Sequence, residues 1–198
     1  MTTNNVRFIK KNLINIMKNT LVISLLLLSS VVARAQENWI TASGGYAFVN
    51  LEDSDEKLNG WRINLSYEKN AFEGKMANGV TLGYIATEGS FGSGLTQRDY
   101  KLNTWPLYYV PKYLIGSGSI KGFIKGAIGL HFSNYTKTET LIIKEDQGVG
   151  FYGGLGAGAM LDIKMIFISI EYEWAYASST FYIDGFMNSA NFGIGIKF

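Results

Sequence analysis

The segment His131-Phe132-Ser133-Asn134 holds the residue types that this sequence could use for covalent chemistry. A histidine and a serine two positions apart lie on the same face of a β-strand, and Glu145 follows downstream. A serine, a base and a carboxylate that orients the base are the components of one form of nucleophilic catalysis. The plainer interpretation of the segment is a lone histidine at the rim of a barrel, where a strand runs into a loop.

The H-x-S-N run with a later glutamate resembles the outer-membrane lipid A deacylases. The resemblance implies that Ser133 is the nucleophile, His131 the base and Glu145 the orienting carboxylate. The chain departs from that family because Tyr135-Thr136-Lys137-Thr138 replaces the expected glycine- and asparagine-rich residues, and because three more strands follow. In the expected register His131 also faces the lumen rather than lipid. We therefore expect a non-enzymatic protein, with a deacylase-like hydrolase as the second alternative.

Charged residues form a second group on the polar face of the expected strands. Its central members are Arg62, Lys125, Glu171 and Glu173. Buried charges require partners, and an eight-stranded barrel is just wide enough for side chains to fill its interior. We predict a lumen ionic network that plugs the barrel, with Lys125 and Glu171 paired at mid-height. The alternative is a narrow polar path, which would make the protein a porin-like pore for small solutes.

Segments of about ten residues with alternating apolar side chains recur eight times after Gln36, separated by polar or glycine-rich breaks. The expected strands are 39–49, 61–69, 78–87, 101–114, 120–132, 150–161, 165–176 and 186–198. Pro106 and Pro111 disturb the fourth, because proline cannot donate to a ladder. Short connections alternate with long ones, as the periplasmic turns and outer loops of membrane barrels do. We therefore expect an all-β fold, an eight-stranded antiparallel up-and-down transmembrane β-barrel with both termini in the periplasm.

The last strand has a distinctive pattern. Phe192, Ile194, Ile196 and Phe198 alternate with small or polar residues, and the final residue is aromatic. A strand that is apolar on one face suits the closing strand of a membrane barrel. The pattern resembles the C-terminal signal read by the bacterial outer-membrane assembly machinery. This resemblance makes the four residues an assembly signal and that machinery a partner.

The first 35 residues have the features of a cleavable secretory signal peptide. Basic residues precede the apolar run 21–32, and Ala33-Arg34-Ala35 provides an A-x-A cleavage site. Met17 is an alternative translation start. We therefore assign residues 1–35 to the signal peptide and 36–198 to the barrel domain.

Removal of that segment changes the charge balance. It carries five of the 18 basic residues, which leaves 13 basic against 16 acidic residues and a net charge of −3. The basic character of the whole chain therefore does not indicate nucleic-acid binding. With no cysteine and one histidine there is no zinc pattern, and we expect neither a metal site nor a cofactor.

Aromatic residues make up 14% of the chain and fall near the strand ends, where the two membrane interfaces would lie. Trp39, Tyr67, Tyr113 and Phe198 are assigned to the periplasmic interface. Phe48, Trp61, Phe132, Trp174 and Phe186 are assigned to the outer interface. A soluble lipocalin-like barrel is the alternative, with its apolar face turned inward to hold a ligand.

The glycine- and aromatic-rich segments 122–130 and 151–158, with the terminal Phe198, resemble the small OmpA/OmpX-type outer membrane protein beta-barrel (porin-like) family. The resemblance implies a location in the outer membrane of a Gram-negative bacterium, but no single activity. We expect an envelope scaffold and surface-interaction or adhesion module. Its expected partners are outer-membrane lipid, lipopolysaccharide and a surface protein bound through loop 134–147. The β-forming residues of 136–143 predict a hairpin that extends beyond the membrane. We expect a monomer.

Overall fold

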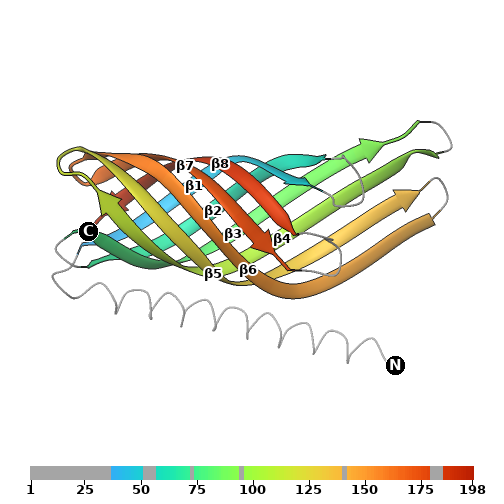
Figure 1. Ribbon diagram of the computed structural model, residues 1–198, viewed down its shortest axis with the longest axis horizontal. Helices are drawn as coiled ribbons and strands as arrows, with labels where there is room; N and C mark the ends of the chain where they lie inside the picture. The colour runs from blue at the N-terminus through green and yellow to red at the C-terminus, as the bar shows by residue number, and fades with distance from the viewer. Residues whose placement is uncertain (1–36, 51–56, 72–73, 94–95, 140–141, 179–184) are drawn as a thin grey trace, which may run out of the picture. The chain divides into compact units, whose positions relative to one another are not determined.

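The structure is a computed structural model that describes residues 37–50, 57–71, 74–93, 96–139, 142–178 and 185–198. These residues form eight antiparallel strands in a closed barrel, in which neighbours in sequence pair and β1 pairs with β8 (Figure 1). The strands are β1 (Asn38–Asn50), β2 (Lys57–Ala71), β3 (Met76–Phe91), β4 (Arg98–Ile115), β5 (Ile120–Glu139), β6 (Ile142–Ile163), β7 (Ile166–Ala177) and β8 (Phe186–Lys197). The predicted fold class is confirmed.

Two sequence predictions fall elsewhere in the chain. The signal peptide and the alternative start at Met17 lie outside the described residues. Among the residues that are described, no helix is long and apolar enough to cross a bilayer.

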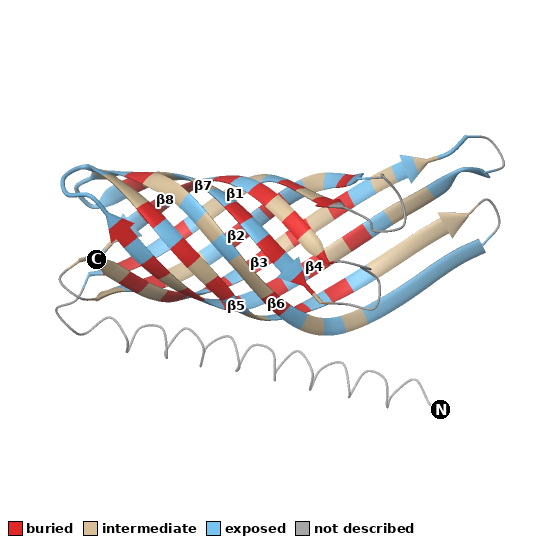
Figure 2. Cartoon of the chain, viewed as in Figure 1, coloured by how far each residue is buried: buried red, intermediate tan, exposed pale blue. Residues whose placement is uncertain are grey.

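Alternation along the strands places apolar side chains outside and polar ones inside. On β2, Ile63 and Leu65 are exposed, whereas Arg62 and Asn64 are buried. Figure 2 shows the resulting alternation of buried and exposed positions around the barrel. This arrangement is the reverse of a lipocalin-like barrel, whose apolar face lines an inner cavity. It is the arrangement that a bilayer stabilises, because the exposed face meets hydrocarbon.

The two prolines of β4 are accommodated by glycines on the neighbouring strands. A Cβ atom on Gly83 would come within 2.9 Å of a Pro106 ring carbon, and one on Gly126 would lie 3.3 Å from a Pro111 ring carbon. Because the glycines leave room for the rings, β4 keeps its register with both neighbours on either side of each proline. The prolines therefore do not interrupt the strand.

The two ends of the barrel differ. At the end that holds Asn38 and Phe198, here called the terminus end, turns are short. At the opposite end, here called the hairpin end, β3, β4, β5 and β6 extend further than the other four strands (Figure 1). The β6–β7 pairing starts at Tyr152 and Ala177, although β6 itself starts at Ile142. Ten residues of β6 therefore extend beyond β7, which corresponds to about 33 Å of strand.

The strands around 136–143 form an extended hairpin, as the β-forming residues predict, and it is larger than predicted. Its position beyond the membrane stays a prediction. The sequence pattern predicts a loop at 134–147, but β5 runs to Glu139 and β6 starts at Ile142. The connection between β3 and β4 is also shorter than predicted, because β3 runs to Phe91 and β4 starts at Arg98. In water both faces of a hairpin can be polar, so these extensions lack the alternation on which the strand boundaries were based.

Apolar side chains fill the lumen near the terminus end. Trp39 packs with Phe167 and the neighbouring Phe123, Leu114, Met160 and Ala77, and its exposed fraction is 1%. The ring centroids of Trp39 and Phe167 are 5.5 Å apart. The assignment of Trp39 to the membrane interface was therefore wrong. Residue 39 has the opposite parity from the outward Ile40, so its ring points into the barrel.

Candidate functional site

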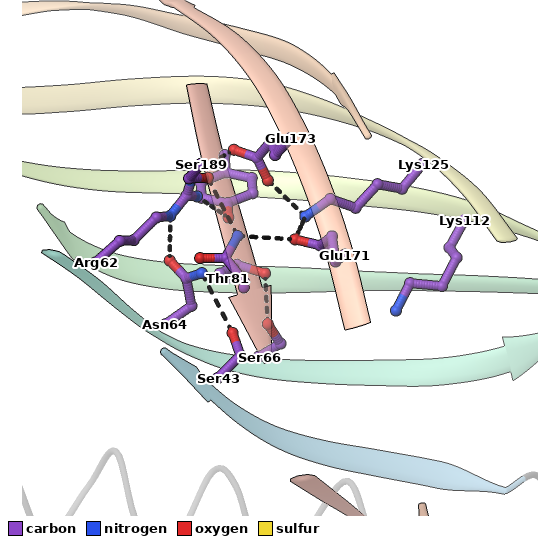
Figure 3. Close-up of polar contacts among 12 residues, drawn as sticks. Ser43, Arg62, Asn64, Ser66, Thr81, Lys112, Lys125, Glu171, Glu173 and Ser189 are labelled. Atoms are coloured by element: carbon purple, nitrogen blue, oxygen red, sulfur yellow. Dashed lines mark hydrogen bonds and ion pairs between the residues drawn. The ribbon is translucent and has the colours of Figure 1, made fainter. Parts of the chain in front are cut away.

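Four charged side chains from three strands meet in the middle of the lumen (Figure 3). Arg62 Nη1 lies 2.6 Å from Glu173 Oε1. Lys125 Nζ lies 2.7 Å from Glu171 Oε1 and 2.5 Å from Glu173 Oε2. The structure thus brings together all four residues of the predicted ionic network, with Lys125 shared between two carboxylates.

Strand β6 explains how Lys125 on β5 reaches Glu173 on β7. Gly156 lies between them and pairs with both residues in register. A Cβ atom on Gly156 would come within 2.7 Å of Lys125 Cε. The missing side chain lets Lys125 lie across β6, so the glycine positions the ion pair.

Neutral polar groups surround the charges. The Arg62 guanidinium donates hydrogen bonds to Asn64 Oδ1 at 2.8 Å, Ser189 Oγ at 3.1 Å and the Tyr108 hydroxyl at 2.6 Å. The Tyr152 hydroxyl donates to Glu173 Oε1 at 2.5 Å. Two cations and two anions, with further hydrogen bonds to Arg62, Glu171 and Glu173, make a neutral assembly that can remain buried.

Sequence reasoning did not single out these four neutral partners. Their inward position follows from strand alternation and could have been read from the sequence. Their specific contacts could not, because the distance across the lumen depends on how the barrel closes.

Below the network, toward the terminus end, the lumen narrows to a polar cavity of about 20 Å³. This volume holds about one water molecule. The cavity lies between Lys125 and a further buried ion pair, in which Lys112 Nζ is 2.7 Å from Glu68 Oε1. The side chains thus leave little free space at this height of the lumen.

A three-residue bridge ties the strands together at the terminus end. Asp162 Oδ2 lies 2.9 Å from Lys121 Nζ and 2.8 Å from Lys197 Nζ. The sequence pattern places Asp162 in a turn and gives no sign that it joins β5, β6 and β8. From the sequence, Asp162 looks like any charged residue of a solvated turn, because it lies at a strand end.

His131 and Ser133 contact each other inside the barrel wall. His131 Nδ1 is 2.8 Å from Ser133 Oγ, and Nε2 is 2.8 Å from the backbone oxygen of Ser178. A carbonyl can only accept, so Nε2 carries the proton and Nδ1 accepts from the serine. Both side chains are buried and face the lumen.

The structure does not bring Glu145 to this pair. Glu145 lies opposite Thr136, whereas His131 lies opposite Gly150 and Ser133 opposite Gly148. An odd spacing from Gly148 also puts Glu145 on the other face of β6. The carboxylate of the candidate triad is therefore in the projecting hairpin, and the group that orients the imidazole is a backbone carbonyl.

The candidate assembly signal lies along the outer face of β8. The side chains of Phe192, Ile194, Ile196 and Phe198 are all exposed on that face. Backbone hydrogen bonds of 2.9 Å and 2.8 Å join Phe198 and Asn38, and these close the barrel between β8 and β1. Recognition of this strand by an assembly machinery stays a prediction.

The projecting sheet has an open edge along β6, on the side that faces away from β5. Phe151 accepts a backbone hydrogen bond from Ser178 on this side, and beyond that point no described strand pairs there with residues 142–150. Residues two apart on a strand direct their backbone groups to the same side. The N–H and C=O groups that point to the open edge are therefore those of Ile143, Glu145, Gln147 and Val149.

Near the tip of this sheet, charged side chains pair with one another. Lys137 Nζ is 2.5 Å from Glu139 Oε1, and Arg98 Nε is 3.5 Å from the same oxygen. The hydrogen bond from Lys137 lowers the pKa of the Glu139 carboxyl, and the charges of Lys137 and Arg98 add to this shift. The same hydrogen bond raises the pKa of Lys137. Both groups are therefore charged at neutral pH.

The sequence matches no protein-family model and no curated protein. Solved structures do share the fold. Neisserial surface protein A is 11% identical over 81% of this chain and 97% of that chain, with a TM-score of 0.61. Ail, the attachment invasion locus protein of Yersinia pestis, is 16% identical over 83% and 100%, with a TM-score of 0.56. A major outer membrane protein from Thermus thermophilus is 10% identical over 83% and 100%, with a TM-score of 0.61. The chain therefore has the fold of the small OmpA/OmpX-type outer-membrane barrels.

Proposed function

We propose that this protein is a non-enzymatic outer-membrane barrel that presents a rigid β-sheet at the cell surface and attaches to extended polypeptide segments. The barrel is the anchor, and the charged network fills its lumen. The open edge of β6 is the attachment element. Its ligand is an unfolded or extended chain that adds to the sheet as a further strand.

The membrane location is supported by the outer face of the barrel. Large apolar side chains are exposed all round the described strands, including Leu65, Leu82, Ile128 and Ile170. A water-soluble protein rarely exposes so large an apolar surface. The short turns lie at the terminus end, so in the usual orientation of such barrels both termini are periplasmic and the hairpins are outside.

The open edge is the observation that carries the attachment role. Exposed edges attract other strands, and proteins normally shorten or cover them. Here no described strand pairs with the nine residues 142–150 on this side. The edge also carries apolar side chains, since Ile142, Ile143 and Val149 have exposed fractions of 57%, 68% and 64%. Main-chain hydrogen bonds along such an edge supply affinity, and the exposed side chains supply contact area.

The structural similarity to Ail is consistent with this role, but the proposal does not depend on it. That protein is by name an attachment invasion locus protein, and its fold is the one seen here. Our proposal rests on the edge of β6 in this chain.

The two alternative functions receive less support. A porin-like pore needs a continuous water path, but the lumen is occupied by ion pairs above and below a cavity of about 20 Å³. A deacylase-like hydrolase needs a serine that lipid can reach, but Ser133 is buried on the lumen side.

The attachment role is tested by removing a backbone donor from the open edge. The Gln147 N–H donates to the Asp146 side chain at 2.8 Å and not to β5, so Gln147→Pro deletes it while the β5–β6 ladder is retained. We expect cells that display Gln147→Pro to lose binding to a surface coated with a permanently unfolded protein. Cells with Gln147→Ala, which keeps the N–H, should bind as the original protein does. A surface coated with the same protein in its native fold should bind none of these cells.

The readout is the number of attached cells, normalised to the heat-modifiable folded barrel in their outer membranes. Binding that survives Gln147→Pro would contradict strand addition at this edge. Antibody access to a tag at Thr138, but not to one at Ser117, checks the orientation independently. The reverse labelling would place the hairpins in the periplasm.

A further inference from the structure

The outer face of β2, β3 and β4 changes from polar to apolar in regular steps below the projecting sheet. Residues that pair across the three strands form rows. From the hairpin end downward, the rows are Asn59–Glu88–Lys101, then Trp61–Ala86–Asn103, then Ile63–Tyr84–Trp105, then Leu65–Leu82–Leu107. In the third row Tyr84 and Trp105 are joined by a ring contact, with centroids 5.2 Å apart. Hydrogen-bonding groups thus lie above the row that contains Tyr84 and Trp105, here called the aromatic step, and aliphatic groups lie below it.

The polar rows surround a hollow. Ala86 is the smallest residue of its row, between Trp61 and Asn103. The space above it is a cavity of about 170 Å³ that Glu88 and Lys101 also line. The Tyr84 hydroxyl donates a 2.9 Å hydrogen bond to Asn103 Oδ1, which fixes the amide at the lower edge of the cavity. A carboxylate, two amides, an ammonium group and an indole therefore line one small space.

A second, apolar hollow lies on the same side of the barrel at membrane depth. It is a groove of about 650 Å³. Ala42 and Gly44 of β1 form its floor, and Ile63 with Leu65 on one side and Phe192 with Ile194 on the other form its walls. Tyr84 and Trp105 also line it, so the aromatic step separates the groove from the polar cavity.

We infer that this face is a binding site for a glycolipid of the outer leaflet, with a headgroup sugar in the polar cavity and an acyl chain in the groove. The inference rests on the proposed outer-membrane orientation. Sugar hydroxyls both donate and accept hydrogen bonds, and Glu88, Asn59 and Lys101 offer acceptors and donors in one row. The exposed indole of Trp61 provides a flat apolar surface for a sugar ring. The aromatic step lies where the membrane interface is expected.

The ligand must be amphiphilic because the two hollows differ in chemistry. A water-soluble protein partner would not reach a groove at hydrocarbon depth. A phospholipid could enter the groove, but its small headgroup would leave most of the polar row unused. An acylated sugar matches both parts of the site.

The opposite side of the barrel contains a matched region, where Tyr172 also borders an apolar hollow, of about 590 Å³. There the Tyr172 hydroxyl donates a 2.9 Å hydrogen bond to Asn188 Oδ1, which repeats the Tyr84–Asn103 contact. Trp174 is exposed to nearly the same extent as Trp61, at 46% against 49%. However, Phe186 stacks on Trp174 with ring centroids 5.0 Å apart and an interplanar angle of 12°, which covers one face of that indole, whereas Tyr84 meets Trp61 in an edge contact at 66°. Trp174 is therefore the natural control for Trp61.

The test measures binding of purified lipopolysaccharide to the full barrel in phosphatidylcholine vesicles. Three variants probe the site: Ala86→Leu fills the hollow, Trp61→Ala removes the indole and Lys101→Ala removes the cation. Each should weaken binding about tenfold, the effect of losing one good polar or packing contact. Trp174→Ala should change it less than about twofold. Band shifts on heating check that every variant is folded.

Competitor lipids identify the part of the ligand that is recognised. Deacylated lipopolysaccharide should compete only weakly, and phosphatidylglycerol should not compete. Equal losses in Trp61→Ala and Trp174→Ala would overturn the inference, because both would then report general lipid contact. Equal competition by phosphatidylglycerol would also overturn it. Neither result depends on the attachment assay, so a failure of this site is distinguishable from a failure of the proposed function.

Discussion

Two lysines on the same face of β5, each paired with a glutamate, show how much the surroundings of an ion pair matter. Lys125 contacts Glu171 at 2.7 Å in the lumen, and Lys137 contacts Glu139 at 2.5 Å in the projecting sheet. The first pair has side-chain exposed fractions of 6% and 14%, the second 23% and 36%. The two pairs have the same chemistry and similar distances, but they differ in their exposure to solvent.

The difference teaches which charges the fold depends on. In the lumen, a charge that loses its partner cannot recover water, so each removal leaves a large penalty. In the projecting sheet, water replaces the lost partner and screens the charges. The barrel therefore depends on its charge balance, whereas the sheet depends on its backbone ladder.

The largest expected effect is at Lys125. Lys125→Met removes the cation shared by Glu171 and Glu173, and we expect a loss of about 3–5 kcal/mol in the free energy of unfolding. Adding Glu171→Gln should recover part of this loss, because the remaining Arg62 and Glu173 balance each other. Urea unfolding in lipid vesicles, followed by tryptophan fluorescence, measures both.

The matched control is the double variant Lys125→Met with Glu173→Gln. It leaves Arg62 and Glu171, which make no ion pair in the structure as described, so less stability should return. Strictly additive effects in both double variants would show that the charges do not couple. An open, water-filled lumen would then be the better description.

A smaller effect is expected at Tyr152. Tyr152→Phe removes one hydrogen bond to the buried Glu173 carboxylate and should cost about 2 kcal/mol. Tyr100→Phe in the projecting sheet keeps the ring that packs against Phe91 and Tyr135 and should leave the unfolding midpoint unchanged. The same urea titration compares the two. Equal costs would mean that lumen and sheet are solvated alike.

The smallest effect is expected at Glu139. Its pKa is lowered from the ordinary value of 4.5, so its contribution is present above that pH and is lost as the pH falls through the folded-state pKa. Acidification from about pH 7 to about pH 3, which spans the usual range of a glutamate, should shift and broaden amide NMR signals near Lys137 and Glu139. Global unfolding should not accompany this change. Glu139→Gln should remove the titration, and a titration that persists in this variant would assign it to another group.

Much of the barrel could be predicted from the sequence because the pattern has a period of two. Alternation along β2 identifies the outward Trp61, Ile63 and Leu65 and the inward Arg62. The same parity, applied to Ile40, places Trp39 inside, although an aromatic ring at a strand end also suits a membrane interface. The projecting ends of β3 to β6 show little alternation, because only a few of their side chains, Phe91, Tyr100 and Tyr135, pack against the core.

The sequence by itself determined the strand count, the inward and outward faces and the set of charges inside the barrel, because each depends on local spacing. Only the tertiary structure decided which of those charges touch. Lys125 reaches Glu173 because Gly156 lies between them once β5, β6 and β7 are in register. The separation of Glu145 from His131 was decided in the same way, by the register of β5 against β6. Contacts across a closed barrel depend on register and closure, which no single segment of the chain specifies.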